Sequence, residues 1–495
     1  MRRILSNPIT ALLVGACLRL LFVFKFPASA GDTAIYEQLA ANWLKYGKYA
    51  MDIGGQPVPV DLRMPGYPAF LVIVYALSGR TGETARLFVM AAQILVDLAT
   101  SLIIALLAGA LVLWCGDHAK PKSAFTAGLW LAVLCPLTAN YVAVPLTEVW
   151  AVLFTSACFL SLVVLAMWVT TGHVPGAISG NPFTRNFWTL AVFAGFTAGL
   201  GTLFRPETPL ILVTSSLLLG YWMWRRGELQ RWLLACFLMV CAGALPLVPW
   251  AIRNAITFHE FQALAPKNTT LPGEVDPQGF MSWERTWLYR VRDCYLVPWK
   301  LNEEAINLED IPDAAFDTPE EKERVATILE TYNDDLMLTA EQDRVFAQLA
   351  RERTARHPFR TYLWIPLLRA GRIWFTPRIE LIPVSGHVFP LAYMSEEDPV
   401  DQRVTILYFS LNLFYVMVAV LGIARLWKCR AARPAIWLLV VYILVRTAFL
   451  TTLEAPEPRY TLECFPALLA LGAQLFVARP NPKAVVGLEI GCGSS

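Results

Sequence analysis

Charged residues are scarce in this chain, and the few present nearly balance. Only 16% of its 495 residues are Asp, Glu, Lys or Arg, and the formal net charge is +2. So small a charge gives no field that would draw the chain to nucleic acid, and we predict no nucleic-acid partner. The 56% hydrophobic content and mean hydropathy of +0.48 exceed what soluble globular domains show, and they favour insertion into a lipid bilayer.

Cysteine pairs of the kind that bind metals are also absent. The ten cysteines include no Cys-x-x-Cys pair, and most stand in apolar stretches. Cysteines in such places behave as small buried apolar side chains. We therefore predict neither a disulfide framework nor a cysteine metal site.

Apolar runs long enough to cross a bilayer recur along the whole chain. A helix needs about 20 apolar residues to cross about 30 Å of hydrocarbon. Ten runs approach that length, although several are short or contain proline. They lie near residues 5–26, 86–114, 123–142, 146–169, 188–204, 208–224, 232–252, 404–427, 434–453 and 460–478.

The N-terminal run allows a second interpretation. Arg2 and Arg3, the apolar run and Ala28-Ser29-Ala30 together resemble a secretory signal peptide with its cleavage site. Arg19 interrupts the run, however, and many further spans follow it. A first transmembrane helix is the preferred interpretation.

Lysine and arginine concentrate in alternate connections between these runs. This bias predicts that those connections are cytoplasmic. They contain Arg2 and Arg3, Lys120 and Lys122, Arg185, Arg225, Arg226 and Arg231, Lys428, Arg430 and Arg433, and Arg479 and Lys483. The other connections, 27–85, 143–147, 205–207, 253–403 and 454–459, then lie on the outer side.

The outer segment 253–403 carries helix signals of its own. Thr318-Pro319-Glu320-Glu321 and Thr339-Ala340-Glu341-Gln342 have the form of capping boxes. We predict a folded, mainly helical outer cap, in which residues 359–376 lie along the membrane interface. The chain then divides into an N-terminal transmembrane module (1–252) whose first outer loop is 27–85, the cap (253–403), and C-terminal transmembrane helices with a short cytoplasmic tail (404–495).

Two outer connections place a carboxylate at the end of a span. Asp32 lies at the mouth of the first span, where a partly desolvated but ionised carboxylate suits a general base. It equally suits a residue that only caps the helix starting at Thr33. Glu148 stands at the start of an apolar span, a costly position unless it faces a polar cavity, a cation or a salt-bridge partner.

The same outer connections supply arginines at helix ends. Guanidinium groups match phosphate oxygens because they donate two parallel hydrogen bonds and remain charged. Four on one face suggest a lipid-linked phosphate, although single juxtamembrane arginines also reach to headgroups or pair with nearby acids. The four are Arg63, Arg205, Arg253 and Arg459.

Two ionisable residues lie deeper, Asp97 in the second span and Arg446 in the ninth. We expect them to pair between helices, with Arg19 as a further partner. A transporter would need such groups at a midplane site, and the two halves of the sequence share no repeated motif that would support one.

Taken in order, these motifs resemble a known family. They are Gly31-Asp32 with Tyr36, Arg63-x-Pro-Gly-Tyr-Pro68, Leu146-Thr147-Glu148, Leu203-Phe204-Arg205-Pro206-Glu207, Pro249-Trp250-x-x-Arg253-Asn254 and Pro458-Arg459-Tyr460. The set resembles the dolichyl-phosphate-mannose protein mannosyltransferase-like enzymes of glycosyltransferase family 39. These are membrane enzymes of the GT-C fold, whose bacterial branch includes lipid A aminoarabinose and galacturonic acid transferases.

The resemblance implies a role for each matched position. Asp32 stands where the family keeps the base that deprotonates the acceptor hydroxyl, and Glu148 where a second acid orients the acceptor or the donor sugar. The four arginines match positions that hold the carrier phosphate. Implied substrate contacts are Tyr36, Glu207, Trp283 and Tyr460.

The expected activity is thus that of an inverting glycosyltransferase in the bacterial inner membrane, with its active site facing the periplasm. Its partners would be a polyprenyl-phosphate-linked sugar donor, the bilayer, and a glycolipid, polysaccharide or protein acceptor. Thr33 replaces the second acid of the protein mannosyltransferases, which argues against a protein acceptor. The sequence has no nucleotide-phosphate loop and no Asp-x-Asp motif, which argues against a nucleotide-sugar donor that needs a metal. We expect no cofactor and no metal. The alternatives are a flippase or exporter of lipid-linked sugars, and a polymerase or ligase with a diphosphate-linked oligosaccharide donor.

Overall fold

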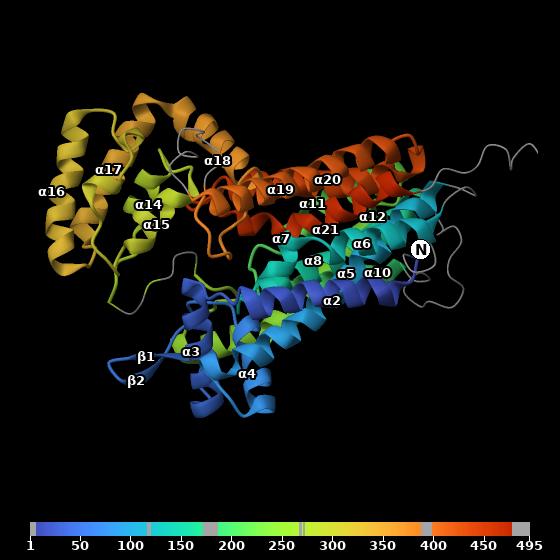
Figure 1. The fold of residues 1–495 in the computed structure, drawn as a ribbon, viewed down its shortest axis with the longest axis horizontal. Helices are drawn as coiled ribbons and strands as arrows, with labels where there is room; N and C mark the ends of the chain where they lie inside the picture. Colours follow the sequence, from blue (N-terminus) through green and yellow to red (C-terminus); the bar gives the residue numbers. More distant parts are fainter. Residues whose placement is uncertain are drawn as a thin grey trace, which may run out of the picture.

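The computed structural model describes residues 6–115, 120–171, 187–266, 270, 273–386, 388 and 398–477. They form a long helical bundle and a separate, mainly helical cap at one end of it (Figure 1). Six described helices are long and apolar enough to cross a membrane, so the prediction of an all-α polytopic membrane protein is confirmed. They are α2 (Pro8–Lys25), α5 (Arg86–Val112), α8 (Glu148–Thr171), α12 (Leu229–Ala244) continued by α13 (Val248–Phe258), α19 (Pro399–Leu426) and α20 (Arg433–Leu450).

Each of the other predicted spans also coincides with helix, in a shorter or bent form. Helix α6 (Pro121–Val133) and the turns that start at α7 (Pro136–Ala139) meet at 53° and together can count as a seventh span. Pro136 explains the break because its ring prevents the helix from continuing. Helices α10 (Phe187–Thr202), α11 (Leu210–Arg225) and α21 (Phe465–Ala473) are too short to cross alone, since a helix rises about 1.5 Å per residue.

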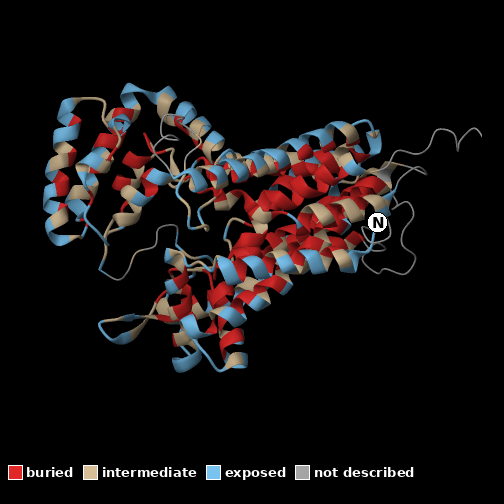
Figure 2. Ribbon diagram, in the orientation of Figure 1, coloured by how far each residue is buried: buried red, intermediate tan, exposed pale blue. Residues whose placement is uncertain are grey.

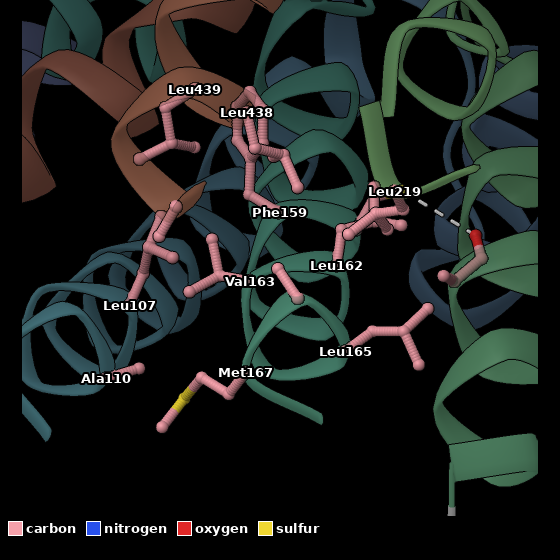
Figure 3. Packing of buried hydrophobic residues seen from close by; sticks show 14 of the residues in the cluster. Leu107, Ala110, Phe159, Leu162, Val163, Leu165, Met167, Leu219, Leu438 and Leu439 are labelled. Atoms are coloured by element: carbon pink, nitrogen blue, oxygen red, sulfur yellow. Dashed lines mark hydrogen bonds between the residues drawn. The ribbon is translucent and has the colours of Figure 1, made fainter. Parts of the chain in front are cut away.

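An apolar core fills the interior of the bundle. Side chains of α5, α8, α11 and α20 interlock around Phe159, Leu162 and Val163 (Figure 3). Buried residues line the interior of the bundle and exposed ones its outside (Figure 2). Leu95, Leu217 and Val240 are among the exposed apolar side chains, 66 to 72% accessible, as expected of a surface that faces lipid.

The first outer loop is itself folded. Helix α3 (Gly31–Tyr46) leads into an antiparallel hairpin of β1 (Ala50–Ile53) and β2 (Gln56–Pro59). Gly54 and Gly55 at its turn have φ of 59° and 79°, a left-handed backbone that glycine adopts without strain. Helix α4 (Gly66–Ser78) follows, an apolar helix that the span pattern did not predict.

Gly66 joins this loop to the segment that carries Arg205. Its amide donates to the Leu203 carbonyl at 2.8 Å, and a Cβ on Gly66 would lie 2.5 Å from that oxygen. No side chain fits there. The Pro-Gly-Tyr-Pro motif therefore allows the close approach that brings Arg63 and Arg205 to one region.

The cap has its own core. Helices α14 (Gln278–Glu284), α15 (Val291–Leu296), α16 (Pro319–Asp335) and α17 (Ala340–Arg356) enclose Phe280, Trp283, Trp287 and Phe346. Thr339 forms the predicted capping box with Gln342. At Thr318 only half of the predicted box forms: its hydroxyl accepts from the Glu321 amide, but the Glu321 carboxylate accepts from the Asp317 amide instead. The predicted division at 252/253 falls within the continuous helix Leu229–Phe258, and that at 403/404 falls within α19.

The segment predicted to lie at the interface is helical from Arg360 to Trp374 and includes α18 (Ile365–Trp374). Its large apolar side chains are exposed: Phe359 is 66% accessible, Tyr362 74% and Leu367 54%. It is not among the helices long and apolar enough to cross. An exposed apolar face on a helix of this kind agrees with the predicted position along the membrane surface.

Arg369 of α18 ties the cap to the bundle. Buried at 2% exposure, its guanidinium donates to the carbonyls of Leu288 at 2.7 Å, Thr451 at 3.1 Å and Arg285 at 3.2 Å. We expect Arg369→Met to leave these carbonyls without donors and to destabilise the docked cap by roughly 2–4 kcal/mol. Limited proteolysis should then cut residues 273–360 faster than in the wild type; an unchanged cutting rate would contradict this anchoring role.

Candidate active site

Asp32 lies in the first turn of α3, and both of its carboxylate oxygens face arginines. Oδ1 accepts from Arg63 Nη2 at 2.8 Å, and Oδ2 accepts from Arg459 Nη2 at 3.2 Å. The helix begins at Gly31, and the Thr33 hydroxyl accepts from the Ala30 amide at its start. Asp32 therefore does not serve as the helix cap, and its carboxylate is directed to the arginines.

Glu148 opens α8 and pairs with Arg205 of the next outer turn. Glu148 Oε1 lies 2.5 Å from Arg205 Nη2 and 3.7 Å from Arg459 Nη1. Its second oxygen, Oε2, is buried and accepts no hydrogen bond from the part of the chain that the structure describes. A buried carboxylate oxygen in this state has capacity for an incoming hydroxyl.

Arg459 thus bridges the two carboxylates that the sequence analysis singled out. It also pairs with Glu457 two residues earlier, donating from Nη2 to Oε1 at 3.0 Å. The structure therefore brings Asp32, Glu148, Arg63, Arg205 and Arg459 into one connected ionic network, although they are as much as 427 residues apart in sequence.

Exposure differs sharply across this network. The side chains of Asp32 and Arg63 are each 24% accessible, whereas Arg205 and Arg459 are at 15% and Glu148 at 3%. A group that takes a proton from an incoming acceptor must be reachable. Asp32 meets that condition better than Glu148, which is almost fully buried.

The charges around Asp32 decide its ionisation. Burial acts to raise the pKa of Asp32, but Arg63 and Arg459 outweigh it, so the pKa lies below the ordinary value of 3.8. The carboxylate is therefore ionised at neutral pH in the substrate-free protein.

Arg253 lies apart from this network. Its guanidinium donates to the Tyr49 carbonyl at 2.8 Å and packs against the rings of Tyr49, Trp250 and Phe258. The Tyr49 hydroxyl in turn donates to the Arg63 carbonyl at 2.8 Å. Arg253 thereby fastens the first outer loop to α13, and its contact with Arg63 is indirect.

The four predicted substrate contacts have different surroundings. Tyr36 is buried one turn after Asp32, with its ring 5.1 Å from that of Tyr67. The Tyr460 hydroxyl donates to Glu457, and its ring lies 5.0 Å from the Arg205 guanidinium. Glu207 pairs with Arg446 at 3.4 Å. Trp283 is only 1% exposed, in the core of the cap.

Two acids of this region were not singled out from the sequence. Glu457 was visible as a charge in the same turn as Arg459, and Glu463 as a carboxylate inside an apolar run. Arg446 pairs with Glu463 at 2.5 Å. The expected pairing of deep charges is thus confirmed for Arg19 with Asp97, but Arg446 pairs elsewhere.

Acids outnumber arginines in the connected network. Its carboxylates come from Asp32, Glu148, Glu207, Glu457 and Glu463, and its guanidiniums from Arg63, Arg205, Arg446 and Arg459. Burial raises the pKa of Glu457 above its ordinary 4.5 despite its pairing with Arg459. Among the described residues no group of three His, Cys, Asp or Glu side chains converges on a metal position.

A cavity of about 370 Å³ lies beside α14 of the cap. Its lining is mostly polar and includes Thr270, Asp276, Gln278, Ser282 and Arg285. Arg285 also pairs with Glu454, in the outer turn that carries Arg459. One ion pair therefore connects the lining of the cavity to the turn 454–459, which we call the arginine turn.

No protein-family model and no curated protein matches the sequence. The fold is similar to that of "archaeal oligosaccharyltransferase AglB from Archaeoglobus fulgidus in complex with an inhibitory peptide and a dolichol-phosphate", with 13% identity, a TM-score of 0.48, and coverage of 99% of this chain and 52% of that one. It is also similar to that of "ArnT from Cupriavidus metallidurans bound to undecaprenyl phosphate", with 15% identity, a TM-score of 0.39, and coverage of 94% and 77%.

This chain thus spans about half the length of the oligosaccharyltransferase. The GT-C resemblance noted in the sequence predicts neighbours of this kind. At such identities and TM-scores the similarity concerns the fold alone. The reaction and its substrates are inferred from the side chains of this chain.

Proposed function

We propose that this chain is an inverting glycosyltransferase that moves a sugar from a polyprenyl-phosphate donor to an acceptor hydroxyl at the outer membrane surface. The observation that carries the proposal is the single network of Asp32, Glu148, Arg63, Arg205 and Arg459 at the cap end of the bundle. One of the basic connections lies at the other end of α8, where Arg226 donates to the Thr170 carbonyl at 2.6 Å. This separation supports an active site on the outer side.

In the proposed reaction Asp32 is the general base. The acceptor hydroxyl gives its proton to the Asp32 carboxylate while its oxygen forms a bond to the anomeric carbon. The bond from that carbon to the phosphate oxygen breaks, and its electron pair leaves with the polyprenyl phosphate. Attack from the face opposite the leaving group inverts the configuration.

The arginines are proposed to pair with carboxylates before the donor binds and with the phosphate afterwards. In the substrate-free network each arginine is paired with a carboxylate, so a phosphate must compete with those carboxylates. Arg63 and Arg459 are the most suitable for exchange because both bind the accessible Asp32. When they turn to the phosphate they release Asp32 to act as a base, and they stabilise the charge that builds on the leaving group.

Glu148 is proposed to orient a sugar hydroxyl. Its Oε1 is fixed by Arg205, and the buried Oε2 has room for one more hydrogen bond. We expect Glu148→Gln to raise the KM for the donor and lower kcat about 10-fold, because an amide keeps one acceptor oxygen but loses the charge-assisted bond. Steady-state kinetics check this, and an unchanged kcat and KM would remove Glu148 from the site.

The acceptor is proposed to be a glycolipid or polysaccharide rather than a protein. Thr33, in place of a second acid, has its hydroxyl occupied by the Ala30 amide and the Pro145 carbonyl. The proposed location is the bacterial inner membrane with the cap in the periplasm.

The two alternatives differ in what they require of Asp32 and of the donor. A flippase or exporter needs no base, and a polymerase or ligase takes a diphosphate-linked oligosaccharide. Purified protein should be incubated with radiolabelled sugar on polyprenyl phosphate or on polyprenyl diphosphate and with a cell-envelope glycolipid. The proposal expects label transfer from the monophosphate donor alone; transfer only from the diphosphate, or movement across a vesicle without transfer, would refute it.

The exchange of arginine partners predicts two different pH profiles. Because kcat/KM reports the free enzyme, its acid limb should lie below pH 3.8, where Asp32 becomes protonated. In the donor complex the arginines face the phosphate, so the Asp32 pKa rises and the acid limb of kcat should lie at higher pH. If the acid limbs of kcat/KM and kcat lay at the same pH, the proposed exchange of arginine partners would be contradicted.

A further inference from the structure

A second group of buried charges lies directly behind the candidate site. Arg446 of α20 is 0% exposed, and its Nη2 lies 2.5 Å from Glu463 Oε1 and 3.4 Å from Glu207 Oε1. Glu463 is 3% exposed, and its Oε2 accepts from the Thr155 hydroxyl at 3.1 Å. We call Glu207, Arg446 and Glu463 the ionic brace.

The ionic brace reaches the site through a side chain. Glu207 Oε1, which faces Arg446, also lies 3.9 Å from Arg205 Nη1. Arg205 in turn holds Glu148 at 2.5 Å. A shift of Glu207 would therefore be passed to the guanidinium that fixes Glu148.

A second connection runs through the backbone of the arginine turn. Arg446 Nε and Nη2 both donate to the Tyr460 carbonyl at 3.1 Å, and Tyr460 directly follows Arg459. The Tyr460 ring lies 5.0 Å from the Arg205 guanidinium and 5.4 Å from that of Arg459. One buried arginine thus fixes the residue whose ring contacts two guanidiniums of the site.

We propose that Arg446 and Glu463 are positioning residues that hold Arg205, the partner of Glu148, and Arg459, a ligand of the carrier phosphate, at the spacing that the transfer requires, an inference that rests on the proposed function. Two guanidiniums beside one ring repel each other, so their separation has to be fixed by surrounding groups. The ionic brace supplies this from α20, the 205–207 turn and the 458–464 turn, and Thr155 of α8 donates to its Glu463. Small displacements of groups that stabilise a transition state cost large factors in rate.

The test compares two buried acids that each pair with a buried arginine. Glu463→Gln keeps shape and a hydrogen-bond acceptor but removes the charge opposite Arg446. Asp97→Asn does the same opposite Arg19, which contacts Asp97, Ser101 and the carbonyls of Gly15 and Val133, away from the site. Both variants should lose thermal stability, whereas only Glu463→Gln should lower kcat, by about 10-fold or more.

Positioning also predicts non-additivity, a result that stability alone would not give. In an Arg205→Lys background, Glu463→Gln should lower kcat much less than in the wild type, because the group it positions is already altered. The proposal would be overturned if Glu463→Gln lowered kcat by the same factor in the Arg205→Lys background as in the wild type. An equal loss of kcat in Asp97→Asn would also overturn it. If Glu463→Gln does not fold, Thr155→Val removes only the hydroxyl from Glu463 and should lower kcat in the same direction.

Hydrogen exchange separates this inference from the proposed function. The ionic brace predicts faster amide exchange at 457–462 in Glu463→Gln than in the wild type or Asp97→Asn, whether or not the chain transfers sugar. Unchanged exchange there would refute the ionic brace. If the wild type transfers no sugar but amide exchange changes as predicted, the proposed function is refuted and the ionic brace is not.

Discussion

Replacing Asp32 with asparagine is expected to lower kcat about 10²- to 10⁴-fold, the range that a general base contributes. Asparagine keeps the size of the side chain and one oxygen for Arg63, so the fold and donor binding should survive. The measurement is single-turnover transfer of labelled sugar from a polyprenyl-phosphate donor, with donor affinity determined separately.

Asp52 supplies a matched control for this variant. It lies in the hairpin of the same outer loop, where its Oδ1 accepts from Asn42 at 3.1 Å. Asp52→Asn makes the same chemical change and should leave kcat within about 2-fold. Equal activity of Asp32→Asn and the wild type would remove Asp32 as the base.

Replacing Arg459 with glutamine should have the second-largest effect. Arg459 is the only side chain in the described residues that contacts Asp32, Glu148 and Glu457 together. Its loss removes one phosphate ligand and leaves three acids close together with less positive charge among them. We expect kcat/KM for the donor to fall about 10²- to 10³-fold, the effect of removing one preorganised group that stabilises developing charge.

Lysine at this position and a second arginine serve as comparisons. Arg459→Lys should recover only part of the loss, because a compact ammonium group lacks the planar fork by which three separate nitrogens of Arg459 reach the three acids. Arg86 of the same face pairs with Glu37 at 2.8 Å outside the network, so Arg86→Gln should leave kcat/KM nearly unchanged. A full recovery by lysine would show that charge alone suffices, contrary to the geometry proposed for Arg459.

The sequence predicted where the long apolar helices lie because a run of about 20 apolar residues is itself the signal for a span. It missed α4, since 13 residues are too few to register as a span. The hydrogen bond from Gly66 to Leu203 that positions α4 depends on a contact across more than a hundred residues. Local pattern carries no information on such contacts.

The sequence showed which charged residues stand at the outer helix ends, but not which of them form ion pairs with one another. Arg253 and Arg459 carry the same signal, an arginine at the outer end of a helix, yet three aromatic rings surround Arg253 and three acids surround Arg459. Glu463 had the signal by which Glu148 was recognised, a carboxylate within an apolar run. Its pairing with Arg446 follows only from the fold.

The most direct measurement is a structure of the protein with a polyprenyl-phosphate sugar bound. We predict the phosphate within hydrogen-bonding distance of Arg459 and of Arg63 or Arg205, with Asp32 beside the anomeric carbon and released from at least one arginine. A phosphate bound elsewhere, for instance at Arg253, with Asp32 still held by both Arg63 and Arg459, would contradict the account.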